Sequence, residues 1–308
     1  MDHDVIVIGG GAAGLSGALM LGRSRRDVLV LDAGEQRNRS AEGVHGFVTR
    51  DGLPPAELVR IGTEEVAGYG VQMRPATATS ARAVDGGFEV SLAVGGAVTA
   101  RRLLVTTGAV DELPDVPGLR EQWGRHVVHC PYCHGWEVRD EPIAVLATGP
   151  AAAHQALLFS QLSDRVSLLT DGHDVADLDL VRAAGVRVVE GQVARILAEG
   201  SQLTGVEVAG SVLPVTTVAV ASKVVARSTV LEALGAETAD LEMGGQLVAR
   251  HVVADPVTRE TSVPGVYAAG NVAEPMAQVV GAAAAGAMAG AVINMALVQE
   301  DVRAAVGA

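Results

Sequence analysis

The apolar positions of the chain fall into short continuous runs, which are separated by glycine-rich turns and by segments of small residues. Residues 4–8 form a run of strand length, and the glycine-rich segment 9–14 follows it. A helix of small residues is expected over 15–22, and a second apolar run at 28–31 ends on Asp32. Continuous runs of this kind are typical of strands buried on both faces of a parallel sheet. The order of strand, helix and strand predicts a βαβ unit at the start of the chain.

The turn after the first strand has the spacing Gly-x-Gly-x-x-Gly. In this pattern Gly9 makes the tight turn, Gly11 lets the backbone approach a pyrophosphate, and Gly14 lets the helix pack on the strand. The helix N-terminus offers N–H groups to the phosphates, and Asp32 accepts hydrogen bonds from a ribose. A glycine-rich turn without a ligand is the alternative. The complete series of strand, turn, helix and acid favours a dinucleotide site.

Further segments repeat and complete this organisation. A strand, a small-residue turn, a helix and a strand over 143–169 predict a second βαβ unit. Apolar strands within 102–109 and 263–272 end at glycines and are expected to return to the first sheet. We therefore expect an α/β fold with two doubly wound, Rossmann-like dinucleotide-binding domains, the second inserted into the first.

Two segments rich in turn-forming residues are the expected crossings between the domains. They are residues 112–118 and the segment Met243-Gly244-Gly245. This gives a discontinuous first domain of residues 1–114 and 245–308 and a second domain of residues 115–244.

Composition narrows the classes of protein. A length of 308 residues suits two domains, and an apolar fraction of 49% supplies their cores. The net charge of −13 argues against nucleic acid and anionic membranes as partners. The acidic start, Met1 to Asp4, lacks the basic stretch of a secretory signal, so a cytoplasmic protein is expected. Residues 275–299 carry no charge, but their Ala- and Gly-rich composition favours a closely packed helix over a membrane span.

The chain has two cysteines, Cys130 and Cys133, which form a Cys-x-x-Cys motif. Reversible dithiol chemistry needs two sulfurs close enough to bond and a thiol of low pKa, and this motif on a turn entering a helix supplies both. Half of a zinc site is an alternative, but a second pair of soft ligands is missing. The neighbouring His129 and His134 are badly placed to close a tetrahedral site. We therefore expect a redox pair and no metal.

Taken together, these residues resemble the low-molecular-weight thioredoxin reductases, two-domain flavoproteins of the pyridine nucleotide-disulfide oxidoreductase group. The resemblance covers essentially the whole chain and rests on the first glycine motif, Thr107-Gly108-Ala109, the cysteine pair and residues 264–272. The run from His129 to Glu137 is more specific and is similar to the branch that includes the dithiol oxidases of gliotoxin and holomycin biosynthesis. The resemblance implies an FAD-dependent disulfide oxidoreductase and a homodimer. Its partner would be a thioredoxin-like protein or a small disulfide or dithiol.

The resemblance also implies a set of FAD-binding residues, carried over by position. They are Gly9, Gly11, Ala12, Ala13, Gly14, Asp32, Ala33, His45, Thr107, Gly108, Ala109, Gly270, Asn271, Gln278 and Val279. Asn271 stands where the family usually has Asp. Gln278 and Val279 open the last helix, whose N-terminus would face the flavin pyrimidine and stabilise negative charge there.

For catalysis, the resemblance implies that Cys133 lies over the flavin and that Cys130 attacks the substrate. His134 occupies the position of the family's acid, an Asp in ordinary thioredoxin reductases, and His129 is the second candidate. A histidine beside the cysteines can move protons near neutral pH.

The second glycine motif departs from the family pattern. Gly149, Pro150 and Ala151 stand in the expected NAD(P) turn, which keeps only the middle glycine and the last alanine of the motif. Asp171 stands where members that use NADPH carry arginines, and it suits a free ribose hydroxyl better than a phosphate. NADPH, NADH and a vestigial site therefore all remain open.

Two functions follow from this pattern. In the first, NAD(P)H is the electron donor and the enzyme reduces a disulfide through FAD and Cys130–Cys133. In the second, the enzyme is a dithiol oxidase that forms a disulfide in a small natural product, with oxygen as acceptor. A flavin-binding sensor without catalysis is disfavoured by the intact cysteine pair.

Overall fold

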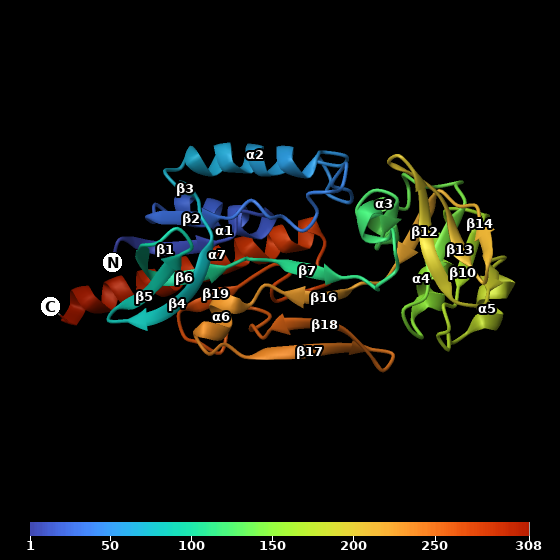
Figure 1. Ribbon diagram of the computed structural model, residues 1–308. Helices are drawn as coiled ribbons and strands as arrows, with labels where there is room; N and C mark the ends of the chain where they lie inside the picture. Colours follow the sequence, from blue (N-terminus) through green and yellow to red (C-terminus); the bar gives the residue numbers. More distant parts are fainter. Residues whose placement is uncertain (308) are drawn as a thin grey trace.

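The computed structural model describes residues 1–307, which form two lobes (Figure 1). The core of the larger lobe is built from β1 (His3–Ile8), α1 (Ala12–Arg23), β2 (Val28–Asp32), α2 (Pro55–Ala67), β3 (Gln72–Pro75), β4 (Ala78–Val84), β5 (Gly87–Leu92), β6 (Ala97–Val105), β19 (Val266–Ala268) and α7 (Val279–Gly307). Its strands are ordered β3-β2-β1-β6-β5-β4, and β19 pairs with β6. Both termini lie at the end of this lobe that is remote from the smaller one.

The first βαβ unit forms where the apolar pattern predicts it. β1 pairs in parallel with β2 and β6, and Val5 to Ile8 are buried. α1 and α7 then cross closely, because a β-carbon at Gly286 would stand 1.9 Å from the Ala13 carbonyl oxygen. The Ala and Gly composition of both helices follows from this close approach.

A second sheet of the larger lobe extends toward the smaller lobe. Its strands are β7 (Ala109–Glu112), β16 (Lys223–Ala226), β17 (Thr238–Met243) and β18 (Gln246–Val252), and helix α6 (Thr229–Ala233) connects β16 to β17. The strand order is β17-β18-β16-β7, and Val230 and Leu231 of α6 belong to the same hydrophobic core as β1 and β6. The chain therefore returns to the larger lobe just before Lys223, well ahead of the boundary expected at residue 245.

The Met243-Gly244-Gly245 segment accounts for this difference. Met243 pairs with Gln246, and the two glycines between them have φ of 60° and 77°. Two consecutive residues with positive φ form the tight turn of a β-hairpin. The turn signal at this position joins β17 to β18 and is not a crossing between lobes.

The smaller lobe contains η1 (Arg120–Gln122), β8 (Val127–Val128), α3 (Pro131–His134), β9 (Ile143–Leu146), α4 (Ala152–Phe159), β10 (Val166–Leu169), α5 (Leu178–Ala183), β11 (Arg187–Val189), β12 (Val193–Glu199), β13 (Gln202–Val208), β14 (Ser211–Leu213) and β15 (Thr217–Val220). Its main sheet has the order β11-β10-β9-β15-β8 with all pairs parallel. β12, β13 and β14 form a separate antiparallel sheet. The prediction of two doubly wound α/β units, one inserted into the other, is confirmed.

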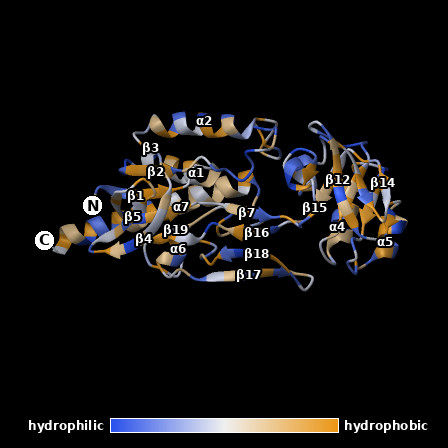
Figure 2. Ribbon diagram, in the orientation of Figure 1, coloured by the Kyte–Doolittle hydropathy of each residue, from blue (hydrophilic) through white to orange (hydrophobic). Residues whose placement is uncertain are grey.

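Helix α7 differs in part from the helix expected over residues 275–299. One side packs in the core through Ala282, Ala285, Ala289, Ile293 and Leu297. The opposite side is exposed and apolar, and Figure 2 shows few hydrophilic residues before its C-terminal end. Among residues 1–307, α7 alone has the length and apolar composition of a membrane-crossing helix.

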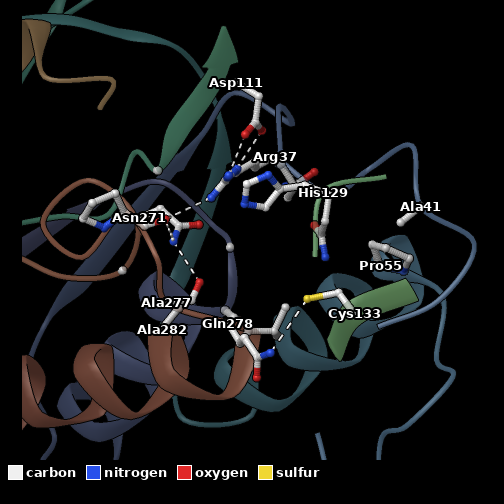
Figure 3. A pocket seen from close by; sticks show the side chains of 18 of the residues that line it. Arg37, Ala41, Pro55, Asp111, His129, Cys133, Asn271, Ala277, Gln278 and Ala282 are labelled. Carbon is white, nitrogen blue, oxygen red and sulfur yellow. Dashed lines mark hydrogen bonds and ion pairs between the residues drawn. The ribbon is translucent and has the colours of Figure 1, made fainter. Parts of the chain in front are cut away.

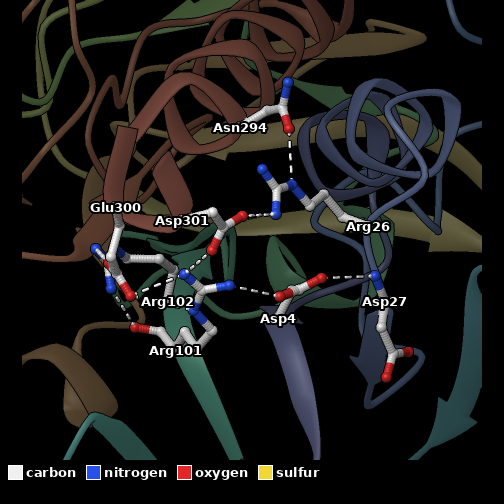
Figure 4. A network of polar contacts seen from close by, with 8 residues as sticks. All are labelled: Asp4, Arg26, Asp27, Arg101, Arg102, Asn294, Glu300 and Asp301. Carbon is white, nitrogen blue, oxygen red and sulfur yellow. Dashed lines mark hydrogen bonds and ion pairs between the residues drawn. The ribbon is translucent and has the colours of Figure 1, made fainter. Parts of the chain in front are cut away.

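Charged and amide side chains fasten the C-terminal part of α7 to the rest of the lobe (Figure 4): Asp4, Arg26, Arg101, Arg102, Asn294, Glu300 and Asp301. Asp27 joins the network through its backbone N–H, which donates to the Asp4 carboxylate. Arg101 is central, because its guanidinium bonds to Asp301 at 2.6 Å and to Asp4 at 3.0 Å. The network joins α7 to β6 and to β1, whose other end leads into the glycine turn.

Candidate active site

A cavity of about 810 Å³ runs between the lobes, from the first glycine turn to the two cysteines. Most of the residues expected at the FAD and dithiol sites line it, together with Ala151 of the expected NAD(P) turn. They are Gly9, Gly11, Ala12, Ala13, Asp32, Ala33, His45, Thr107, Gly108, His129, Cys130, Cys133, His134, Ala151, Gly270, Asn271, Gln278 and Val279. The fold thus brings together segments from both ends and the middle of the chain.

The first glycine turn is an open cradle. Gly9 has φ of 109°, and a β-carbon there would stand 2.5 Å from the Thr106 carbonyl oxygen. A β-carbon at Gly14 would stand 1.9 Å from the Gly9 carbonyl oxygen, so Gly14 serves packing and does not line the cavity. Gly11 has nothing within 4 Å of the same position, so the backbone is bare toward the cavity. An elongated phosphate-bearing ligand fits this surface.

Asp32 is held at the edge of this cradle. One carboxylate oxygen accepts a hydrogen bond from the Gly10 N–H at 3.0 Å, and the other accepts one from the Gln36 amide at 3.2 Å. The acid at the end of β2 is therefore oriented before any ligand arrives, as a ribose acceptor requires.

At the far end of the cavity, Asn271 organises the segment that leads into α7 (Figure 3). Its amide nitrogen donates to the carbonyl oxygens of Glu274, Pro275 and Ala277 at 3.1, 3.2 and 2.9 Å. An aspartate has no such donor, so the departure from the family's Asp has a structural reason. Gln278 follows this segment and reaches the cysteines.

The two cysteines are free thiols on the short helix α3 and just before it. The amide of Gln278 donates to Cys133 Sγ at 3.8 Å (Figure 3), so Cys133 faces the α7 end of the cavity. The pKa of Cys130 is lowered to about 6, chiefly by a hydrogen bond from the Cys133 thiol and also by the N–H groups of Tyr132 and Cys133, although partial burial opposes the shift. The same shared hydrogen bond raises the pKa of Cys133. Cys130 is thus the thiolate of the pair at neutral pH.

Two histidines lie beside the cysteines. Both ring nitrogens of His134 are buried without a hydrogen-bond partner, and burial lowers the pKa of His134. Burial also lowers the pKa of His129, whose Nδ1 lies 3.1 Å from the Val220 carbonyl oxygen. When Nδ1 carries the proton and donates a hydrogen bond to this carbonyl oxygen, Nε2 of His129 is free to accept a proton. His45 lies between the lobes, with Nε2 3.5 Å from a carboxylate oxygen of Glu137.

The structure also shows a charged cluster near His129 that no sequence pattern predicted. Arg37 bonds Asp111 through two nitrogens, at 2.6 and 2.8 Å (Figure 3). The Ser222 hydroxyl donates to the same carboxylate at 2.6 Å. Burial alone would raise the pKa of Asp111, but the Arg37 guanidinium outweighs it and lowers that pKa. These residues are far apart in the chain, so no spacing could have linked them.

The second glycine turn differs from the first. Gly149 and Pro150 do not line the cavity, and Pro150 removes one N–H from the turn. A β-carbon at Gly149 would stand 2.0 Å from Gln246 Oε1, because the Gln246 amide lies on this glycine and donates to the Thr148 carbonyl oxygen at 2.8 Å. Asp171 is also away from the cavity, and its carboxylate accepts from the Val193 N–H at 2.7 Å.

Ala109 is the remaining expected residue that does not reach the cavity. It is 1% exposed and pairs with Ala226 in the sheet that carries the chain toward the smaller lobe. Its neighbours Thr107 and Gly108 do line the cavity.

Known proteins match this chain over nearly its whole length. Residues 3–286 match the family model described as pyridine nucleotide-disulphide oxidoreductase. The chain is 32% identical to thioredoxin reductase tcpT of Claviceps purpurea, over 96% of this chain and 95% of that protein. It is 31% identical to thioredoxin reductase sirT of Leptosphaeria maculans, over 98% and 96%. The crystal structure of HlmI superposes with a TM-score of 0.89 at 42% identity, covering 99% of this chain and 95% of that one.

The chain therefore belongs to the pyridine nucleotide-disulphide oxidoreductase family, whose members use FAD and NAD(P)H. Within it, the protein is an FAD-dependent disulfide oxidoreductase of the thioredoxin reductase type, as the resemblance implied.

Proposed function

We propose that this enzyme oxidises a small dithiol to its disulfide and passes the electrons through FAD to oxygen. The observation that carries this choice is the contrast between the two glycine turns. The first is an open cradle, whereas the second has lost an N–H at Pro150, has no arginine beside Asp171 and is covered at Gly149. A dithiol reaching Cys130–Cys133 needs no second dinucleotide site.

The first turn and Asp32 would hold the ADP half of FAD, and Asn271, Gln278 and the start of α7 would surround its flavin end. The open backbone at Gly11 and the pre-oriented Asp32 support this assignment. FAD, when bound, supplies a two-electron acceptor that oxygen can reoxidise.

The thiol chemistry begins with the Cys130–Cys133 disulfide. A substrate thiolate attacks Cys130 Sγ, and the bond between the two cysteines breaks with its electron pair on Cys133. The second substrate thiolate attacks the substrate sulfur of the mixed disulfide, which forms the product disulfide and releases Cys130 as a thiolate. A pKa of about 6 makes Cys130 a good leaving group in this step.

Each turnover removes two protons from the substrate thiols. His134 and His129 have lowered pKa values and are neutral near pH 7, so each can accept one proton. The buried, unpartnered nitrogens of His134 support it as the first acceptor.

A test of the function measures oxygen uptake by the FAD-loaded enzyme with dithiothreitol and without nicotinamide. Sustained uptake that ends when the dithiol is consumed is expected. Fast, saturable flavin reduction by micromolar NADPH, with no uptake on dithiol, would contradict the proposal. That outcome would favour the second candidate, a disulfide reductase driven by NAD(P)H, which the names of the thioredoxin reductase relatives support.

We further propose a cytoplasmic homodimer that binds neither nucleic acid nor membrane, paired through the exposed face of α7. This face carries Val280, Met288, Met295 and Val298, and the helix has no charged residue before Glu300. Two copies can therefore meet there without opposing like charges, although each chain carries a charge of −13. Sedimentation should give a dimer, and Met288→Glu with Met295→Glu should give a monomer. A monomeric native protein would refute this pairing, and binding to anionic vesicles would refute the proposal that the protein binds no membrane.

A further inference from the structure

The smaller lobe has a dinucleotide-type turn that is covered by a side chain from the larger lobe. The turn joins β9 to α4 and contains Thr148 and Gly149, whereas Gln246 opens β18 directly after the hairpin turn. The Gln246 amide nitrogen donates to the Thr148 carbonyl oxygen at 2.8 Å. The contact therefore crosses from one lobe to the other.

The Gln246 side chain occupies the surface that such a turn offers to a ligand. Beyond Gly149 Cα, the β-carbon position lies 2.0 Å from Gln246 Oε1 and 2.5 Å from its Cδ. A glycine at this place normally leaves the backbone bare so that a pyrophosphate can lie on it. At Gly11 of the first turn, the corresponding position has nothing within 4 Å.

Strand geometry explains why Gln246 in particular reaches the turn. Side chains alternate between the faces of a strand, so Gln246 and Val248 share a face and Leu247 takes the opposite one. Val248 lines the cavity between the lobes, as expected for that face. The tight Gly244-Gly245 turn fixes this register.

We propose that Gln246 determines donor specificity by excluding nicotinamide dinucleotides from the second glycine turn. The inference rests on the proposed function for what replaces them, a dithiol substrate. Gln246 covers Gly149 in the same arrangement of the lobes in which Gln278 bonds Cys133. A dinucleotide can reach Gly149 only after the Gln246 side chain leaves.

The test is an anaerobic titration of the FAD-loaded protein with NADH, in which NADH fluorescence reports binding and flavin absorbance reports reduction. Gln246→Ala removes the cover, and Gln246→Asn withdraws the amide by one methylene. The Kd of each variant for NADH should be at least about tenfold lower than the Kd of the native protein. Leu247→Ala on the opposite face is the matched control and should bind like the native protein. FAD content checks that each variant is folded.

Two outcomes would overturn the inference: native protein that already binds NADH saturably at micromolar concentration, or two Gln246 variants that bind no better than Leu247→Ala. Oxygen uptake with dithiothreitol, measured on the same native preparation, tests the proposed function separately. Oxygen uptake by the native protein, with no gain in NADH affinity in the Gln246 variants, would support the proposed function and rule out the role of Gln246. A gain in NADH affinity in the variants, with no oxygen uptake by the native protein, would support the role of Gln246 and rule out the proposed function.

Discussion

The two glycine turns of this enzyme follow the same kind of buried strand and precede the same kind of helix, yet one is open and the other is closed. The first is bare at Gly11 and is backed by the close crossing of α1 and α7. The second is overlaid at Gly149 by Gln246 from the other lobe. A dinucleotide fold can therefore persist as a scaffold after its binding surface is covered. In the proposed function, the smaller lobe contributes its cysteine pair to the chemistry.

The largest effect is expected when the cysteine pair of the smaller lobe is removed. Cys130→Ser should lower dithiol oxidation by on the order of a thousandfold or more, because no sulfur remains for the substrate to attack. FAD should stay bound, and the remaining Cys133 thiolate near the flavin should give a long-wavelength charge-transfer band in the absorbance spectrum. Cys133→Ser serves as the comparison. Equal bands in the two variants would show that the cysteine roles are assigned wrongly.

The contrast between the turns themselves can be tested by adding one methyl group to each. Gly11→Ala places a β-carbon in open space, so the protein should fold but bind FAD roughly a hundredfold more weakly, because the methyl group stands where the pyrophosphate approaches. Gly149→Ala displaces only the Gln246 side chain and should leave FAD content and dithiol oxidation nearly unchanged. Flavin titration of both proteins measures this. An equal loss of FAD affinity in the two variants would mean that the two turns do not differ in their role in FAD binding.

The cysteine chemistry should also depend on pH in a defined direction. Because the pKa of Cys130 is about 6, alkylation of the reduced enzyme by iodoacetamide should fall about tenfold per pH unit below 6 and level off above it. Cys133→Ala removes the thiol that donates to Cys130, so the midpoint should move upward toward that of an ordinary thiol. An unchanged midpoint would show that the backbone N–H groups alone lower this pKa.

The smallest expected effect concerns the charged network that anchors α7, the helix packed behind the first glycine turn. Arg101→Ala breaks the contacts from β6 to Asp4, Glu300 and Asp301 and should lower the melting temperature by ~3 °C. Arg303→Ala, at an exposed position of α7 close to Glu300 and Asp301 in the chain, is the matched control and should change the melting temperature by less than ~1 °C. Thermal unfolding by circular dichroism distinguishes them. An equal effect of both changes would mean that the network does not anchor α7.

Much of this architecture could be predicted from local patterns. Buried strands followed by small-residue turns identify both βαβ units, and the spacing of Gly9, Gly11 and Gly14 identifies the open turn. The resemblance to thioredoxin reductases added Gln278, which no local pattern would have linked to Cys133. These features lie either within one supersecondary unit or within a known family motif.

The features that escaped prediction depend on contacts between distant segments. Arg37 with Asp111, and Gln246 with Gly149, are joined only by the tertiary fold, and ordinary polar residues carry no sign of such pairing. The boundary between lobes was misplaced for a different reason. Two glycines mark a hairpin turn and a domain crossing equally well, and only the pairing of β17 with β18 distinguishes them.

The strands that connect the lobes have a consequence for how the molecule can be divided. β7 leaves the larger lobe and β16 returns to it, and the two run antiparallel with Glu112 opposite Lys223. The whole smaller lobe is thus topologically the loop of a hairpin. An Asn-Gly turn between Glu112 and Lys223 could replace it without moving any other strand. The shortened chain would be a self-contained flavin-binding module, onto which a different thiol-bearing or reporter domain could be grafted at the same two residues.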